Sequence, residues 1–175
     1  MRDFYRNLRR SNTIKKARPN ILFIVFDQMR ADALIGPLAD TIELPNFTQF
    51  KNESVSFLNH FSVTSPCGPA RASLLTGQYA MNHRSVRNGT PLAHDTSNLA
   101  TSLNSIGIEP LLYGYTDTSQ DPRMYGQSDP ILTSYEEVLN GFTEVQEMRF
   151  DTNKSWKDYL REKNYKFDKL SEIFE

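Results

Sequence analysis

The lone cysteine of this chain, Cys67, stands in a segment whose residue types could stabilise a negative charge. Pro69 has the φ angle that suits the first turn of a helix, which would place Cys67 at a helix N-terminus. Free backbone amides and the helix dipole favour an anion there. Arg71 follows four residues after Cys67, one turn along the same helix face, so that a guanidinium could complete an oxyanion site. A buried cysteine beside an exposed arginine is an equally good interpretation of these residues.

A second feature with chemical potential is Asp27, followed by Gln28, directly after the apolar residues 21–26. In open α/β sheets, ligands gather beyond the carboxyl ends of the strands. Carboxylate oxygen at such a position suits a hard divalent cation. A strand-end aspartate that caps the following turn is the alternative.

Length and charge limit the class of protein. The chain has 175 residues, which suits one ordinary domain, and its formal net charge of −1 excludes a strongly basic nucleic-acid binder and an acidic disordered chain. The longest apolar run, residues 21–26, is far too short to cross a membrane. A single cysteine excludes an intrachain disulfide. No secretory signal follows the basic residues 1–18, so we expect a cytoplasmic protein without membrane or nucleic-acid partners.

We expect residues 1–18 to be a basic extension, either solvated or in an oligomer contact, and residues 19–175 to form part of one domain. Contact of the extension with phosphates or a membrane surface is the alternative. Alternating strand and helix patterns indicate an α/β layered fold. The expected strands are residues 21–26, 54–59 and 110–115, and the expected helices are a short one from Pro45, then 70–79, 96–106, and 156–174 with a break near Asn164; residues 116–134 have the composition of a long loop.

The segment from Cys67 to Gly77 resembles the signature of the type I sulfatases, in the alkaline-phosphatase superfamily. Residues 20–27 resemble the first strand and metal aspartate of that family. Gln28, in place of a second aspartate, is similar to the phosphonate monoester hydrolase and phosphodiesterase branch, as are the segments 81–84, 114–116 and 121–123. The resemblance covers residues 19–163. It implies the N-terminal part of an alkaline-phosphatase-like α/β/α sandwich with a mostly parallel central sheet.

The resemblance also implies roles for particular residues. Asp27 would be a metal ligand, Gln28 a weak ligand or a neighbour of the metal, and the cation Ca²⁺, Mn²⁺ or Mg²⁺. A formylglycine-generating enzyme would oxidise Cys67 to Cα-formylglycine, which would also contact the metal. Arg71 would orient the hydrated aldehyde. One hydroxyl of that hydrate would attack sulfur or phosphorus, and loss of a proton from the other would regenerate the aldehyde and expel the product.

Three further residues match substrate-binding positions of the family. Asn88 resembles a contact to a substrate oxygen, although a turn asparagine before glycine explains it nearly as well. Tyr115 resembles a pocket residue at a strand end, with a core tyrosine as the alternative. Asp117 stands where the phosphonate branch has threonine and other sulfatases have lysine, so it alters the charge around the substrate anion.

These features predict metal- and formylglycine-dependent hydrolysis of small anionic phosphonate, phosphate or sulfate esters. The Asp-His pair, the lysine and the histidine that complete the site in the family lie far downstream, and the histidines His60, His83 and His94 do not replace them. We therefore expect the N-terminal portion of a hydrolase, nearly inactive alone and completed by a homo-oligomer or a complementing C-terminal chain. The alternative is a non-catalytic remnant that at most binds anions or a partner chain.

Overall fold

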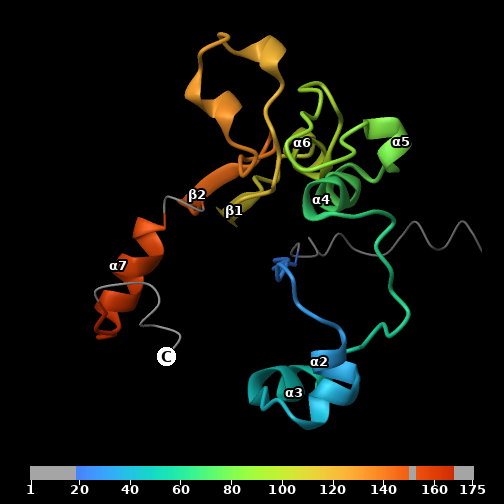
Figure 1. Cartoon of the computed structure of the whole chain (residues 1–175), viewed down its shortest axis with the longest axis vertical. Coiled ribbons are helices and arrows are strands. Elements are labelled where there is room, and N and C mark those ends of the chain that lie inside the picture. The colour runs from blue at the N-terminus through green and yellow to red at the C-terminus, as the bar shows by residue number, and fades with distance from the viewer. Residues whose placement is uncertain (1–18, 150–152, 168–175) are drawn as a thin grey trace, which may run out of the picture. The chain divides into compact units, whose positions relative to one another are not determined.

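The computed structural model describes residues 19–149 and 153–167 (Figure 1). The chain divides into two units, Met1–Ser56 and Phe57–Glu175, and each is described by itself. The predicted basic extension, residues 1–18, lies outside the described residues. Residues 168–174 of the predicted last helix lie outside them as well.

The first unit contains short helices that begin at prolines or at an acidic residue. They are α2 (Asp32–Ile35), the 3-10 helix η1 (Pro37–Asp40) and α3 (Pro45–Asn52). Pro45 occupies the first turn of α3, where its missing N–H costs no hydrogen bond. The helix expected from Pro45 is therefore confirmed.

The strands expected at residues 21–26 and 54–59 are wrong, because neither segment forms a strand in this structure. The apolar side chains of the first segment are exposed, from 85% at Ile21 to 48% at Val25. A buried parallel strand requires neighbouring strands at its edges and helices over its faces. Among the described residues, no strand pairs with either segment. Apolar composition identifies a segment that is able to be buried, but it does not supply the partner.

The second unit holds most of the regular structure (Figure 1). Its elements are α4 (Cys67–Thr76), α5 (Ala80–His83), α6 (Leu99–Ser105), β1 (Leu111–Gly114), the 3-10 helices η2 (Pro122–Met124) and η3 (Pro130–Thr133), β2 (Thr143–Glu147) and α7 (Lys154–Glu162). The helices expected at 70–79 and 96–106 correspond to α4 and α6. The buried apolar side chains of this unit include Leu92, Ala100 and Leu139, which come from three separate segments.

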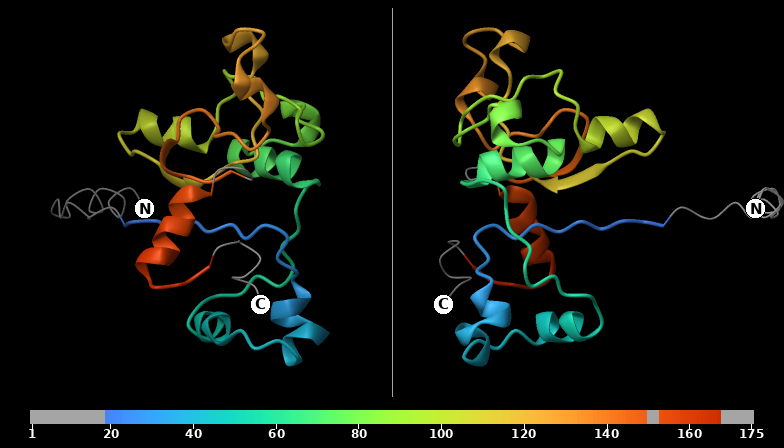
Figure 2. Two further views of the ribbon diagram at one scale, coloured as in Figure 1. Left: turned by 60° about the vertical axis from the view of Figure 1, so that its left-hand side comes forward. Right: turned by 90° about the vertical axis from the view of Figure 1, so that its right-hand side faces the viewer.

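A small parallel sheet joins β1 to β2, with Leu111 opposite Thr143 and an irregularity between Leu112 and Tyr113. The expected strand at 110–115 is confirmed as β1. Sequence analysis missed β2, because its mostly polar, exposed residues carry no apolar pattern. The long connection between the strands contains η2 and η3 and extends away from the sheet (Figure 2).

Asn98 ties α6 to the residues before β2. Its side chain accepts a hydrogen bond from the backbone N–H of Thr101, and the hydroxyl of Thr101 accepts one from the N–H of Asn98, which is a capping box. The side-chain amide of Asn98 also donates to the carbonyl of Asn140 at 3.0 Å. One buried asparagine therefore caps a helix and joins two segments that are 42 residues apart.

The last described helix, α7, starts two residues before the expected position and ends at Glu162. Asn164 follows with a φ of 67°, in the left-handed region that stops a helix. The break expected near Asn164 is confirmed. Within the described ranges, no helix has the length and apolar character needed to span a membrane.

His83 connects α5 to α4 through a buried hydrogen bond. Its Nδ1 accepts from the backbone N–H of Ser85 at 3.1 Å, so the ring proton sits on Nε2. That nitrogen lies 2.9 Å from the hydroxyl of Ser73 in α4 and donates to it. Burial lowers the pKa of His83, because it penalises the charged ring.

We predict that acid weakens this connection. The pKa of folded His83 lies below its ordinary value of 6.5, so the unfolded chain takes up the proton first as the pH falls. The free energy of unfolding should therefore decrease as the pH drops below about 6.5, and it should recover above that value. Urea unfolding at a series of pH values measures this dependence.

His83→Gln should remove most of the pH dependence just below pH 6.5, above the range in which carboxylates titrate, whereas His60→Gln, at an exposed position, should keep it. Ser73→Ala should cost about 1 kcal/mol at neutral pH, because the imidazole N–H loses its buried partner. An unchanged pH dependence in His83→Gln would contradict the role of this ring.

Candidate active site

Cys67 is the first residue of α4, and it is half-buried. The helix begins with the hydrogen bond from the N–H of Ala70 to the carbonyl of Pro66, and it ends at Thr76, followed by Gly77, whose φ of 68° is left-handed. Pro69 lies in the first turn, as expected for a residue without a backbone N–H. The predicted position of Cys67 at a helix N-terminus is therefore confirmed.

Asn88 holds the N-terminus of α4 with both ends of its side-chain amide. Its Oδ1 accepts from the backbone N–H of Gly68 at 2.9 Å, and its Nδ2 donates to Cys67 Sγ at 3.0 Å. A Cβ on Gly68 would lie 2.9 Å from Asn88 Oδ1, so only glycine leaves room for this contact. Asn88 lies in the turn before Gly89, as the alternative interpretation expects, and its side chain also contacts Cys67.

Arg71 is enclosed by residues at the end of β1. Its Nη1 donates to the carbonyl of Tyr115 at 3.2 Å, and its guanidinium lies over the ring of Tyr115, 5.0 Å from the centroid. Its Nε forms an ion pair with Asp117 Oδ2 at 3.3 Å. The side chain of Arg71 is 14% exposed, so the alternative of an exposed arginine beside a buried cysteine is wrong.

Asp117 is buried and has a φ of 54°, in the left-handed region. Aspartate and asparagine tolerate this conformation, whereas a β-branched threonine is strained there. A threonine at this position would therefore not suit the backbone seen here. The carboxylate faces Arg71, which makes it a counter-ion within the site.

The pKa of the Cys67 thiol is raised above its ordinary value. Burial is the largest cause, followed by the nearby carboxylate of Asp117, while the hydrogen bond from Asn88 opposes the shift. The thiol therefore stays protonated at neutral pH, and unmodified Cys67 is a poor nucleophile.

The structure thus brings together five of the residues singled out in the sequence: Cys67, Arg71, Asn88, Tyr115 and Asp117. Asp27 and Gln28 belong to the other unit. They form a turn in which Gln28 has a φ of 56°, rather than the end of a strand. Whether Asp27 and Cys67 face one cation stays a prediction.

The donor set fits a divalent cation only in part. The carboxylate of Asp27 and the amide oxygen of Gln28 are hard oxygen ligands, which such a cation prefers. The thiol of Cys67 is a soft ligand and does not suit it. No cluster of three or more His, Cys, Asp or Glu side chains that could hold a metal occurs in residues 19–149 and 153–167. Asp27 and Gln28 can therefore supply part of a coordination shell.

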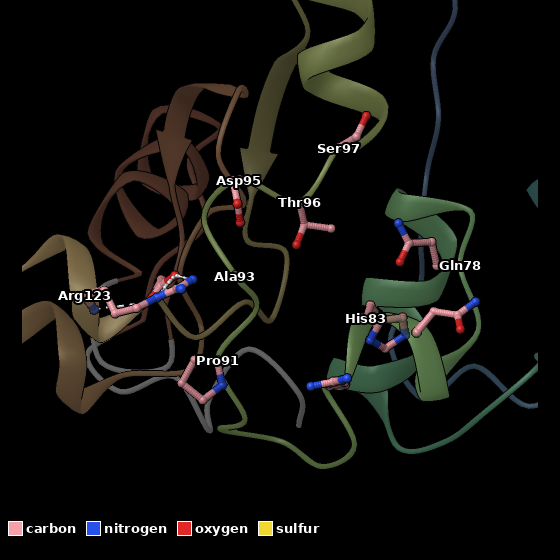
Figure 3. A pocket seen from close by; sticks show the side chains of 11 residues that line it. Gln78, His83, Pro91, Ala93, Asp95, Thr96, Ser97 and Arg123 are labelled. Carbon is pink, nitrogen blue, oxygen red and sulfur yellow. Dashed lines mark hydrogen bonds and ion pairs between the residues drawn. The ribbon is translucent and has the colours of Figure 1, made fainter.

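A cavity of about 520 Å³ lies elsewhere in the second unit, and sequence reasoning missed it (Figure 3). Polar side chains predominate in its lining, among them Gln78, His83, Asp95 and Arg123, and none of the five residues around Cys67 takes part. Buried Asp121 fixes one wall: its carboxylate accepts from Arg123 and from the N–H of His94, and these bonds hold its pKa well below the ordinary value. The segments 81–84 and 121–123, noted in the sequence for their resemblance, both contribute to its lining, but nothing in their residue types predicted that they share a cavity.

Comparison with known proteins gives a consistent result. The family model described as Sulfatase matches residues 19–170. The multifunctional alkaline phosphatase superfamily protein PehA of Trinickia caryophylli is 43% identical over 133 residues, which cover 73% of this chain and 26% of that protein. The solved phosphonate monoester hydrolase of Silicibacter pomeroyi has a TM-score of 0.77 and 57% identity, over 87% of this chain and 30% of its own. That of Agrobacterium radiobacter has a TM-score of 0.74 and 44% identity, over 84% and 29%. The chain thus spans less than a third of the length of each of these relatives.

We predict that Asn88→Ala destabilises the second unit by about 2 kcal/mol, because two hydrogen bonds at the start of α4 are lost at about 1 kcal/mol each. Gly68→Ala should cause a similar loss through a different atom, since the new methyl group displaces Asn88 Oδ1. Asn82→Ala, at an exposed position of α5, is the matched control and should change little. Urea unfolding compares the four proteins, and an unaltered stability of both site variants would refute the bridging role of Asn88.

We further predict weak metal binding by the chain of 175 residues. Ca²⁺ takes about six to eight oxygen ligands, and the side chains of Asp27 and Gln28 offer at most about three, so the dissociation constant should exceed about 1 mM. Isothermal titration calorimetry with Ca²⁺ and Mn²⁺ measures it, with Asp27→Asn as the comparison. Tight, stoichiometric binding that Asp27→Asn abolishes would show that this chain completes the metal site.

Proposed function

The chain belongs to the sulfatase family and has the N-terminal part of its alkaline-phosphatase-like fold, and from this premise we propose that its Cys67 site hydrolyses anionic esters. In this proposal, Cys67 is the precursor of Cα-formylglycine, and Asp27 and Gln28 hold a Ca²⁺, Mn²⁺ or Mg²⁺ ion. The substrates are phosphonate monoesters and phosphodiesters, with sulfate esters as secondary substrates.

The main support for the proposal is the set of groups that surround Cys67 at the N-terminus of α4. A residue at this position lies at the positive end of the helix dipole, while the N–H groups of Gly68 and Ala70 already donate to Asn88 Oδ1 and to the carbonyl of Pro66. Asn88 adds an uncharged donor 3.0 Å from Sγ, and Arg71 lies one turn along the helix. These groups favour negative charge beside the side chain of residue 67, and the carboxylate of Asp117 opposes them.

The hydrated aldehyde would supply a hydroxyl as the nucleophile, and the bound cation would lower the pKa of that hydroxyl, which a thiol at this position does not replace. The residues of this chain bind and orient. Arg71, held in place by Tyr115 and Asp117, fixes the direction of the side chain at position 67. Asn88 Nδ2, which now donates to Sγ, is placed to donate to an oxygen of the substrate or of the modified residue.

Two features support phosphonate monoesters and phosphodiesters as the substrate class. Both solved relatives described above are phosphonate monoester hydrolases. Gln28 stands where many sulfatases have a second carboxylate, and Asn88 is an amide rather than a cation. A site of low charge accepts a singly charged ester without demanding a dianion, whose desolvation costs more.

Because the chain spans less than a third of its relatives, a complementing chain or region would have to supply the remaining ligands. A formylglycine-generating enzyme is the second partner that the proposal requires, and we propose a cytoplasmic location. The alternative is a non-catalytic remnant that binds anions or a partner chain. An adjacent reading frame that encodes an Asp-His pair and a lysine would favour the enzyme, and its absence would favour the remnant.

We predict that co-expression with a formylglycine-generating enzyme lowers the mass of the Cys67 peptide by about 18 Da, which is the difference between the thiol and the aldehyde. Peptide mass spectrometry measures the change, and Arg71→Ala tests whether the conversion depends on the motif. A peptide that stays at the thiol mass under these conditions would argue for the non-catalytic remnant.

A chimera tests the substrate class. Residues 19–170, which match the family model, would replace the corresponding part of the Silicibacter pomeroyi hydrolase, with which the chain shares 57% identity. We expect p-nitrophenyl phenylphosphonate and bis-p-nitrophenyl phosphate to have a higher kcat/KM than p-nitrophenyl phosphate, and Cys67→Ala to abolish turnover. Highest activity toward the sulfate or the phosphate monoester would overturn the proposed substrate class but would leave the family assignment intact.

A further inference from the structure

We propose that Asp117 is a specificity-determining residue that selects singly charged esters against dianions by offsetting the charge of Arg71. The inference rests on the proposed function, because it concerns the anion that binds beside Cys67. It gives Asp117 a different role from the substrate contact expected from its position in the sequence.

The evidence begins with the ion pair between the two side chains. Arg71 Nε lies 3.3 Å from Asp117 Oδ2, and only 14% and 3% of the respective side chains are exposed. Solvent therefore screens the pair weakly, and each charge acts strongly on any neighbouring ion. The start of α4 also lies next to this pair, because a Cβ on Gly68, the residue after Cys67, would be 3.5 Å from the carbonyl oxygen of Asp117. An anion beside Cys67 meets both charges together.

The carboxylate is fixed in this position by the backbone around it. The N–H groups of Thr116 and Thr118 both donate to the carbonyl of Glu137 at 3.3 Å. The hydroxyl of Thr116 donates to the same carbonyl at 2.9 Å and accepts from the N–H of Leu139 at 2.7 Å. These bonds anchor the residues on both sides of Asp117, so its left-handed conformation and its orientation toward Arg71 are maintained.

The selection follows from Coulomb's law. The attraction of an anion to Arg71 and its repulsion by Asp117 both scale with the charge of the anion. Because the two protein charges nearly cancel, a second negative charge on the ligand gains little attraction, yet its desolvation costs more. The side-chain amide of Asn88, which has a second N–H beside the one donated to Sγ, and the positive end of the α4 dipole still favour one anionic oxygen. The site therefore favours a monoanion, and removing the carboxylate should help a dianion most.

The test measures anion binding by the chain of 175 residues with unmodified Cys67, so it requires no turnover. The probes are sulfate, a dianion, and methanesulfonate, a monoanion of similar shape, and both keep their charge around neutral pH. Asp117→Asn removes the charge and tolerates a φ of 54°. We expect the affinity to rise by about tenfold per unit of ligand charge, hence about tenfold for methanesulfonate and about a hundredfold for sulfate. Amide chemical shifts of Gly68 and Asn88 at low ionic strength report the binding.

Asp129→Asn is the matched control, because it removes one carboxylate elsewhere and retains a side chain that can cap η3. It should leave both affinities unchanged, and Arg71→Gln added to Asp117→Asn should abolish the gain. If Asp117→Asn does not fold, Asp117→Gly removes the charge with a residue that also accepts a positive φ. Equal gains for the two probes, or no gain in a folded variant, would overturn the role of Asp117. Failure of the proposed function would appear instead as an unmodified Cys67 or an inactive chimera.

Discussion

A guanidinium and a carboxylate that are both withdrawn from water must remain together, and this constraint governs the site around Cys67. Removing either partner would leave the other as a buried charge without compensation, which is strongly unfavourable. Arg71 belongs to α4 and Asp117 follows β1, so their ion pair fixes the helix against the end of the strand. Tyr115 closes the same contact with its carbonyl and its ring. The position of Cys67, at the start of α4, depends on this attachment.

The same contacts explain why the site is poised for an anion without being strongly cationic. Asn88 provides a neutral donor and α4 provides the positive end of its dipole, while Arg71 has its charge offset by Asp117. Such a site differs from one that relies on several cations, because it binds oxygen by directed hydrogen bonds rather than by net charge. The relatives described above are longer, and this chain spans less than a third of each. The second unit therefore supplies the surroundings of residue 67, and the proposed metal ligands Asp27 and Gln28 belong to the first.

Local signals in the sequence predicted the helices better than the strands. Pro45, Pro69, Gly77 and Asn98 each act on their own few residues, so α3, α4 and α6 lie close to where they were expected. A strand instead depends on a partner that is distant in the sequence. Residues 21–26 have strong strand composition but no strand beside them among the described residues, whereas the polar β2 forms because β1 lies next to it. Composition alone was misleading in both cases.

The sequence by itself determined the family, the cysteine at a helix N-terminus and the arginine one turn later, because the Cys67 segment is contiguous and its geometry follows from helix periodicity. Only the tertiary structure decided what these residues contact. Asn88 is 21 residues from Cys67, and Asp117 is 46 residues from Arg71, so the path of the intervening chain determines whether each pair meets. The fold buries Arg71 instead of exposing it, and it turns Asp117 toward that arginine. The physical reason is that a buried charge needs its partner within a few ångströms, and only the folded chain can provide that distance.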